Sequence, residues 1–344
     1  MKPFAMTQGD AAGIGPELIA KIFLETPDLV KNCLVVGDAA VMQRAVQIYS
    51  DAGAARVPVV VLDQVTQLSG VAPGSLPVLQ VGAMDALPAW GAVNAAAGRL
   101  AADCVTWAAR AALRGEIAAL VTAPLHKEAL AAAGVPYPGH TELLQAEAAA
   151  FLGRAIHDVP VRMMLANDEL RTVLVSIHVS LRDAIEAVTL DNVLQTLQIT
   201  HAAVSASLGR PARIALAGLN PHAGEGGLFG REEIEVLIPA VAAARAMGLQ
   251  VTGPLAPDTV FMRARHATGH PGEFDVVVAM YHDQGLIPVK YLGVDKGVNV
   301  TLGLPLVRTS PDHGTAFDIA GQGTADAASL RAAMAMARTL SSMS

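Results

Sequence analysis

Three histidines follow strand-like apolar segments and could together bind a metal ion. His178 and His282 come directly after such segments, and His222 lies in the short loop after a third one. Ligands bind at the carboxyl ends of strands in open α/β sheets, so these imidazoles could converge at one sheet edge. Three imidazoles with an open fourth position suit a catalytic divalent ion such as zinc. Each histidine could instead be a loop residue with satisfied hydrogen bonds.

A second group of residues could bind an anionic substrate. His140 and Thr141 lie in a Pro/Gly-rich loop that leads into a helix, where a hydroxyl and free backbone N–H groups suit a phosphate or carboxylate. Lys290 and Arg308 could neutralise a doubly charged ligand, and Asn299 offers an uncharged donor and acceptor. The alternative is that Thr141 only caps the helix and that both cations are solvated surface side chains.

The chain lacks the glycine pattern of an ordinary dinucleotide-binding fold. A G-x-G-x-x-G motif after a strand would bind the pyrophosphate, but the glycines of segment 9–15 have a different spacing and Asp10 would repel it. Segment 312–323 is a second candidate for a nucleotide, with a tight glycine turn, small side chains and the carboxylate of Asp318. This segment could also be a turn before a helix.

The elements that must position these residues alternate along the chain. Helices are expected to begin near Pro16 and to cover 92–113, 190–208, 232–247 and 329–340. Strands are expected over 33–38, 57–62, 118–122, 161–166, 172–177, 213–219 and 276–280, with a hairpin turn at 167–169 and a loop over 70–82. Such alternation predicts an α/β fold with parallel or mixed sheets.

Composition narrows the class of protein further. The 344 residues are 52% hydrophobic and 16% charged, enough for two α/β lobes with large cores. The formal net charge of -7 argues against nucleic acid or an anionic membrane as the main partner, and no uncharged apolar stretch reaches the ~18 residues of a membrane helix. Cys33 and Cys104 form no CxxC pair and the first ten residues resemble no signal peptide, so a cytoplasmic location is expected.

Five motifs together carry a family resemblance. They are GDAAGIGPE at 9–17, PGHTE at 138–142, GLNPHAGE at 218–225, MYHDQG at 280–285 and GVNVTLGLP at 297–305. With these motifs the chain resembles the 4-hydroxythreonine-4-phosphate dehydrogenase family, which performs the oxidative step of vitamin B6 synthesis. The loop 313–321 is also similar to the adenine-side loop of isocitrate and isopropylmalate dehydrogenases.

The resemblance implies a two-lobed α/β subunit with the isocitrate/isopropylmalate dehydrogenase-like fold, in which α/β/α lobes surround a central cleft. The first lobe is expected to comprise residues 1–139 and 305–344, and the second residues 140–304 with the metal histidines and dimer contacts. The resemblance also implies a homodimer. One divalent ion per site, zinc or alternatively magnesium, cobalt or manganese, would be held by His178, His222 and His282, with ligands shared between subunits.

The same resemblance implies roles for further residues. Those expected to bind the substrate are His140, Thr141, Lys290, Asn299 and Arg308. Those expected to bind NAD or NADP are Gly303, His313, Gly314 and Asp318. Lys290 is also a candidate for proton transfer. Asp258 and Asp283 are candidate bases, although either could instead orient a metal-bound imidazole.

The expected reaction is metal-dependent oxidation of 4-phosphohydroxy-L-threonine by NAD(P), with decarboxylation to 3-amino-2-oxopropyl phosphate in pyridoxal phosphate biosynthesis. The chain departs from the family pattern at two places, of which the first is minor and the second concerns the substrate. Ala11 replaces a proline, and His178 lies in Ile-His-Val-Ser-Leu where the vitamin B6 enzymes more often have Thr-His-Leu-Pro-Leu. The alternatives are paralogues that oxidise 4-phospho-D-threonate, 4-phospho-D-erythronate or the terephthalate cis-dihydrodiol. An acyltransferase on a related fold would not need three metal-binding histidines, and a ligand-binding protein would reduce no nicotinamide.

Overall fold

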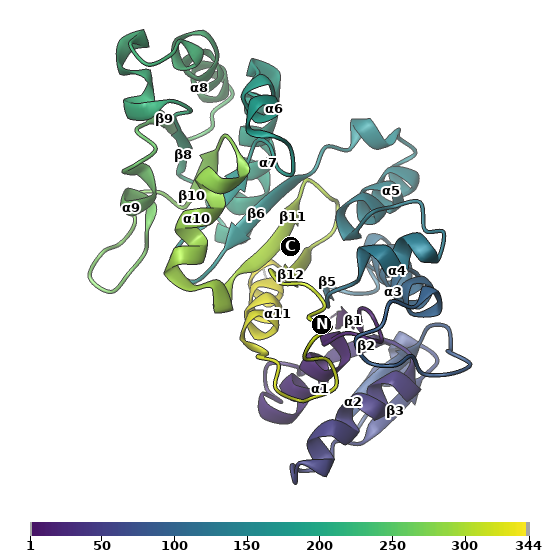
Figure 1. The fold of residues 1–344 in the computed structure, drawn as a ribbon. Coiled ribbons are helices and arrows are strands. Elements are labelled where there is room, and N and C mark those ends of the chain that lie inside the picture. Colours follow the sequence, from purple (N-terminus) through teal and green to yellow (C-terminus); the bar gives the residue numbers. More distant parts are fainter. Residues whose placement is uncertain (1, 342–344) are drawn as a thin grey trace. The chain divides into compact units, whose positions relative to one another are not determined.

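The computed structural model describes residues 2–341, which divide into two compact units (Figure 1). The first unit comprises the chain up to Pro160 together with Leu304–Ser341, and the second comprises Val161–Gly303. The expected divisions were at 139/140 and 304/305, whereas the observed ones are at 160/161 and 303/304. Helix α5 (His140–Leu152) therefore lies in the first unit and not in the second. Within residues 2–341, no helix is long and apolar enough to cross a membrane.

The first unit is built on six strands in the order β3-β4-β2-β1-β5-β12. The strands are β1 (Phe4–Thr7), β2 (Cys33–Gly37), β3 (Val59–Leu62), β4 (Leu76–Gln80), β5 (Ala119–Thr122) and β12 (Arg308–Pro311). The helices are α1 (Gly15–Glu25), α2 (Ala39–Asp51), η1 (Val65–Gly70), α3 (Ala95–Leu113), α4 (Lys127–Ala132), α5, η2 (Ile156–Asp158) and α11 (Ala328–Ser341).

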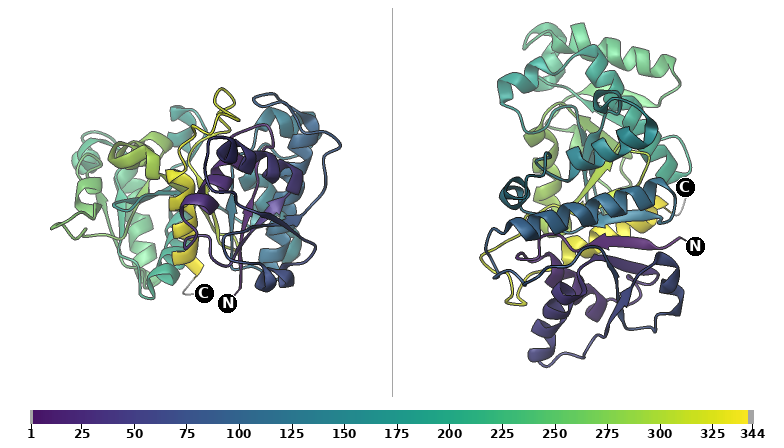
Figure 2. Two further views of the ribbon diagram at one scale, coloured as in Figure 1. Left: turned by 90° about the horizontal axis from the view of Figure 1, so that it is seen from below. Right: turned by 90° about the vertical axis from the view of Figure 1, so that its right-hand side faces the viewer.

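The central strands of this unit are apolar on both faces because helices cover both sides. Every residue of β1, β2 and β5 is buried, and these strands pair in parallel. Helix α3 packs on β1, β2 and β5, whereas α11 packs on β12 and β5, and Figure 2 shows the two helices on opposite sides of the strands. Strand β4 is among the strands that were not predicted: it lies in the segment 70–82, for which a loop was expected. Its residues are buried by pairing with β2 and β3, which Pro/Gly content does not reveal.

The second unit contains strands in the order β11-β6-β7-β10-β8-β9. The strands are β6 (Arg162–Ala166), β7 (Arg171–Leu174), β8 (Ile214–Ala217), β9 (Val251–Leu255), β10 (Val276–Ala279) and β11 (Val298–Leu302). The helices are α6 (Leu181–Glu186), α7 (Leu190–Leu208), η3 (Pro221–Gly227), the π-helix η4 (Glu233–Leu237), α8 (Ile238–Ala246), α9 (Val260–Ala264), α10 (His282–Gly293) and η5 (Val294–Lys296).

Strand β10 is the centre of the second unit. It pairs in parallel with β7 on one side and with β8 on the other, with Val277 opposite both Thr172 and Ala215. Helices α9 and α10 share a core with one face of these strands, while α7 lies behind them in Figure 1. The predicted hairpin is confirmed: β6 and β7 are antiparallel, and the Asn167 side chain accepts the N–H groups of Glu169 and Leu170 in the turn.

The contact between α3 and α4 depends on one glycine in the first turn of α3. A Cβ placed on Gly98 would lie 2.1 Å from the backbone oxygen of Ala129 in α4. Because the obstacle is backbone, no side-chain rotation can relieve it. Gly98 therefore sets how closely α4 approaches α3.

We predict that Gly98→Ala destabilises the protein by about 1–3 kcal/mol through overpacking. Helix propensity alone would make the same change stabilising by about 1 kcal/mol. The free energy of unfolding, measured by urea titration, shows whether Gly98→Ala destabilises or stabilises the protein. Gly70→Ala is the matched control, because a Cβ there meets nothing within 4 Å. A more stable Gly98→Ala variant would show that the close approach does not exist.

Candidate active site

The three predicted metal histidines follow three neighbouring parallel strands, β7, β8 and β10. His178 lies beyond the end of β7, His222 lies in η3 after β8, and His282 is the first residue of α10 after β10. The rings of His178 and His282 have centroids 5.6 Å apart. Within residues 2–341, no three His, Cys, Asp or Glu side chains are gathered closely enough to hold an ion. The structure thus brings two of the histidines together and places the third on an adjoining strand end.

The chemistry of these histidines fits a borderline divalent cation. His282 Nδ1 lies 2.7 Å from Asp283 Oδ1, and His222 Nδ1 lies 3.2 Å from Glu225 Oε2. Histidines that ligate metals usually donate their other ring nitrogen to a carboxylate or carbonyl, which orients the ring. For His222 and His282, Nε2 is therefore the ring nitrogen that would ligate an ion. The contact with His282 favours a role for Asp283 in orienting that imidazole over a role as a catalytic base.

His222 lies in a run of left-handed backbone. The φ angles of His222, Ala223 and Glu225 are 53°, 53° and 43°, and the glycines at 224 and 226 are also positive. For residues with a Cβ this conformation costs about 1–2 kcal/mol each. Strain of this kind persists only where the surroundings enforce it, and such positions concentrate at functional sites.

Arg308 is a buried cation in the first unit. The residue is 3% exposed, and its Nε and Nη2 donate to Thr122 Oγ1 at 3.1 and 2.7 Å. Burial lowers the pKa of Arg308 to about 10, while the nearby charge of Glu142 opposes the shift. The side chain thus remains charged at neutral pH. Its burial overturns the alternative of a solvated surface arginine, and a buried cation of this kind favours an anionic ligand.

His140, the first residue of α5, carries no charge beside this cation. Burial, and then the charge of Arg308, lowers the pKa of His140 well below its ordinary range, although a hydrogen bond to the Ala123 backbone opposes this. Its Nε2 is buried and has no hydrogen-bond partner. Thr141 does not cap the helix: the N-cap is Gly139, and no side chain makes the cap hydrogen bond. The neutral His140 ring can therefore accept a hydrogen bond from a ligand.

Three further predicted residues lie in the second unit. Lys290 is exposed on α10, about 12 Å along the helix axis from His282. Asn299 is half-buried in β11, opposite Leu165 of β6. Asp258 is exposed just before α9, after the carboxyl end of β9.

The predicted nucleotide loop 312–323 is attached to the start of α1. The Ile14 N–H donates to Thr315 O at 3.0 Å, and the Gly321 N–H donates to Glu17 Oε2 at 2.8 Å. Gly321 has a φ of 81°, and a Cβ there would lie 2.5 Å from the Trp90 ring. The predicted cofactor residues His313, Gly314 and Asp318 are exposed on this loop, whereas Gly303 ends the second unit.

The sequence did not lead us to select His126 or Asp10 as a site residue. The His126 ring stacks on Phe317 with centroids 4.5 Å apart, and its Nδ1 is buried without a partner. Asp10 is fully buried, and burial raises the pKa of its carboxyl group. His126 follows strand β5, so the strand-end criterion that selected the other histidines would also have found it.

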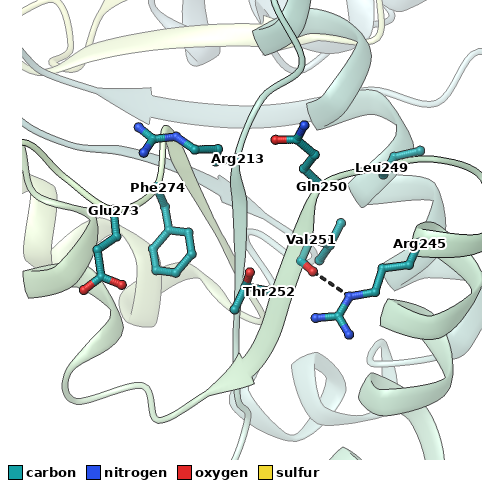
Figure 3. Close-up of a pocket in the computed structure, with 8 residues that line it drawn as sticks. All are labelled: Arg213, Arg245, Leu249, Gln250, Val251, Thr252, Glu273 and Phe274. Atoms are coloured by element: carbon teal, nitrogen blue, oxygen red, sulfur yellow. Dashed lines mark hydrogen bonds between the residues drawn. The ribbon is translucent and has the colours of Figure 1, made fainter.

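A hollow of about 280 Å³ lies at the other end of the second unit's strands (Figure 3). Arg213 and Phe274, which line it, precede β8 and β10, and Arg245 Nε donates to Val251 O at 2.8 Å. No predicted site residue lines this hollow. Ligands of open α/β sheets bind at the carboxyl ends of strands, so we do not assign the active site to it.

Comparison with known proteins establishes the family. The family described as pyridoxal phosphate biosynthetic protein PdxA matches residues 29–337. The chain belongs to the PdxA family. A 4-hydroxythreonine-4-phosphate dehydrogenase of Beijerinckia indica is 53% identical to this PdxA-family chain, over 98% of the chain and 95% of the relative. A D-threonate 4-phosphate dehydrogenase of Salmonella typhimurium is 42% identical, over 98% and 99%. The family resemblance predicted from the motifs is confirmed.

Solved structures agree with this PdxA assignment. A 4-hydroxythreonine-4-phosphate dehydrogenase of Klebsiella pneumoniae has a TM-score of 0.86 at 40% identity, covering 99% of this chain and 100% of that one. A terephthalate 1,2-cis-dihydrodiol dehydrogenase of Burkholderia xenovorans has a TM-score of 0.67 at 29% identity, covering 98% of both. A β-decarboxylating dehydrogenase of Thermococcus kodakarensis has a TM-score of 0.50 at 14% identity, covering 99% and 83%. This last likeness concerns the fold alone and confirms the predicted fold class.

We predict that, because of His140, the free energy of unfolding decreases as the pH falls from 7.5 to 5.5. Its pKa is lower in the folded than in the unfolded chain, so the unfolded state binds more protons as pH falls below about 6.5. This stabilising contribution is complete at pH 7.5 and declines by at most about 1.4 kcal/mol per pH unit on acidification. His140→Asn should therefore lose less free energy of unfolding than wild type between pH 7.5 and 5.5.

The matched control is His157→Asn, because the His157 side chain is 85% exposed. Urea titrations at both pH values should give this variant the wild-type pH dependence. An equal pH dependence for His140→Asn and wild type would contradict the inference that His140 is neutral.

Proposed function

We propose that this chain is a 4-hydroxythreonine-4-phosphate dehydrogenase of pyridoxal phosphate biosynthesis, acting in the cytoplasm. It would oxidise 4-phosphohydroxy-L-threonine with NAD or NADP and release carbon dioxide, giving 3-amino-2-oxopropyl phosphate. PdxA-family membership and the 53% identity to the Beijerinckia enzyme support the substrate. The observation that carries the proposal is the placement of His178, His222 and His282 after three adjoining parallel strands.

These three histidines would hold one divalent ion, zinc first and magnesium, cobalt or manganese as alternatives. Such an ion supplies Lewis-acid chemistry, which lowers the pKa of a substrate hydroxyl. Asp283 fixes the His282 ring through Nδ1, and Glu225 does the same for His222. Because both carboxylates contact Nδ1, Nε2 is the ring nitrogen that would ligate the ion.

The substrate phosphate would be bound by residues of the first unit. Arg308 contributes a buried positive charge, which an anion can neutralise. The His140 ring beside it is neutral, so its Nε2 can accept a hydrogen bond from a protonated group of the ligand. Thr141 adds its hydroxyl and the N–H groups of the first turn of α5.

The remaining residues would position the reacting end of the substrate. Lys290 would anchor an acidic group and could move a proton, Asn299 would add a donor and an acceptor, and Asp258 is the remaining candidate base. NAD(P) supplies hydride acceptance. It would bind at Gly303 and at His313, Gly314 and Asp318, on the loop that Glu17 and Ile14 hold in place.

A homodimer with a shared metal site is part of this proposal. Large apolar side chains lie exposed close to the histidines in sequence: Val179 and Leu181 after His178, and Leu228 and Phe229 after His222, with exposures of 55, 60, 73 and 49%. Exposed apolar side chains mark protein interfaces where they form a contiguous patch, so these four are the proposed interface residues. Sedimentation velocity should give twice the mass of one chain, and a single-chain species at micromolar concentration would contradict the dimer.

A second candidate substrate is 4-phospho-D-threonate. The 42% identity to the Salmonella dehydrogenase covers almost all of both chains. In addition, His178 lies in a segment that differs from that of most vitamin B6 enzymes. This alternative keeps the phosphate-binding residues and the metal histidines and changes only the recognition of the carbon chain.

The decisive assay is nicotinamide reduction with a panel of substrates. The panel comprises 4-phosphohydroxy-L-threonine, 4-phospho-D-threonate, 4-phospho-D-erythronate and the terephthalate cis-dihydrodiol, each with NAD and with NADP. We expect the highest kcat/KM with 4-phosphohydroxy-L-threonine, and a loss of at least about 100-fold after chelation or in His282→Ala, since the substrate hydroxyl is then no longer activated.

The control variant is His157→Ala, which removes an exposed imidazole of the first unit. It should retain full turnover. Full turnover of His282→Ala after chelation would refute the metal-dependent mechanism. The highest kcat/KM with 4-phospho-D-threonate would instead select the second candidate.

A further inference from the structure

The left-handed turn that carries His222 is wound around one buried carboxylate. Glu233, the first residue of the π-helix η4, is 2% exposed. Its Oε1 accepts the N–H groups of Leu219 and Asn220, both at 2.8 Å, and its Oε2 accepts the Asn220 side-chain amide at 2.9 Å. The carboxylate thereby fixes both the backbone and a side chain directly before His222.

Glycines make this wrapping possible. A Cβ on Gly224 would lie 2.7 Å from Glu233 Oε2, and one on Gly218 would lie 3.3 Å from Oε1. At Gly230, a Cβ would lie 2.5 Å from the Asn220 amide nitrogen. The loop therefore touches the carboxylate on both sides of His222. Single-turn π-helices occur frequently at functional sites, and this one places Glu233 inside the loop.

Gln284 connects this turn to the strand end of His282. Its Oε1 accepts the Met280 N–H at 2.7 Å, and its Nε2 donates to Gly218 O at 2.7 Å. The Ser176 hydroxyl donates to Met280 O at 2.9 Å, which adds the strand end that leads to His178. One hydrogen-bonded chain thus links the ends of β7, β10 and β8.

We propose that Glu233 and Gln284 are positioning residues for the metal site. Glu233 holds His222 in its strained turn, and Gln284 sets the spacing between that turn and His282. Neither side chain needs to touch the ion. The inference rests on the proposed function, because it assumes that His222 and His282 ligate one divalent cation.

The test is cobalt binding by the full-length protein, measured by titration calorimetry and by the visible absorption of bound Co²⁺. In Glu233→Gln one carboxylate oxygen becomes an NH₂ group. Because both oxygens accept N–H groups, either orientation of this amide sets a donor against a donor. We expect the Kd for Co²⁺ to rise about tenfold or more and the visible band to change, because loss of outer contacts weakens metal sites by about 10–100-fold.

Glu232→Gln is the matched control, because Glu232 makes one hydrogen bond to the same Asn220 amide and none to the backbone of Leu219 or Asn220. It should bind Co²⁺ with the wild-type Kd and spectrum. Gln284→Met keeps the side-chain length and removes both bridging hydrogen bonds. It should weaken Co²⁺ binding as Glu233→Gln does. If Glu233→Gln does not unfold cooperatively and is therefore misfolded, Gln284→Met alone tests the positioning role.

Wild-type affinity and an unchanged band in a folded Glu233→Gln or Gln284→Met variant would overturn the positioning role. Absence of Co²⁺ binding by the wild-type protein would overturn the proposed metal site itself and this inference with it. The two failures are distinguishable, because the first appears only in the variants.

Discussion

The parallel pairing of β10 between β7 and β8 is the constraint on which the candidate site depends. Adjacent strands lie about 4.8 Å apart, so the ends of three neighbouring strands fall within about 10 Å. His178, His222 and His282 are far apart in sequence, and this strand order alone brings them to adjoining strand ends. The 5.6 Å between the His178 and His282 rings is a direct consequence. A different order of the same strands would leave three unrelated loop histidines.

The two units offer different electrostatic environments. The first holds a buried, charged Arg308 beside a neutral His140, an arrangement that favours an anion. The second holds histidines whose rings are oriented by Asp283 and Glu225, an arrangement that favours a cation. These two sets of side chains connect the PdxA-family assignment to particular residues within each unit.

The sequence predicted the α/β class, most strands and the strand-end positions of the histidines, because buried parallel strands produce continuous apolar runs and site residues interrupt them. It could not predict β4, whose burial depends on pairing with β2 and β3. It also could not show that Thr141 leaves the α5 cap empty or that Arg308 is buried. The sequence could not predict the burial of Glu233 either, because a glutamate at a helix start usually faces solvent. Only the fold around it shows that its carboxylate receives three N–H groups.

The central claim is that one divalent ion is bound by imidazoles from three adjoining strand ends. X-ray absorption at the zinc edge of the zinc-loaded protein tests this claim most directly, because it counts the imidazole ligands and gives their distances. We predict three imidazole nitrogens at about 2.0–2.1 Å from the zinc. A first shell made only of oxygen atoms, or one with fewer than three imidazoles, would contradict it.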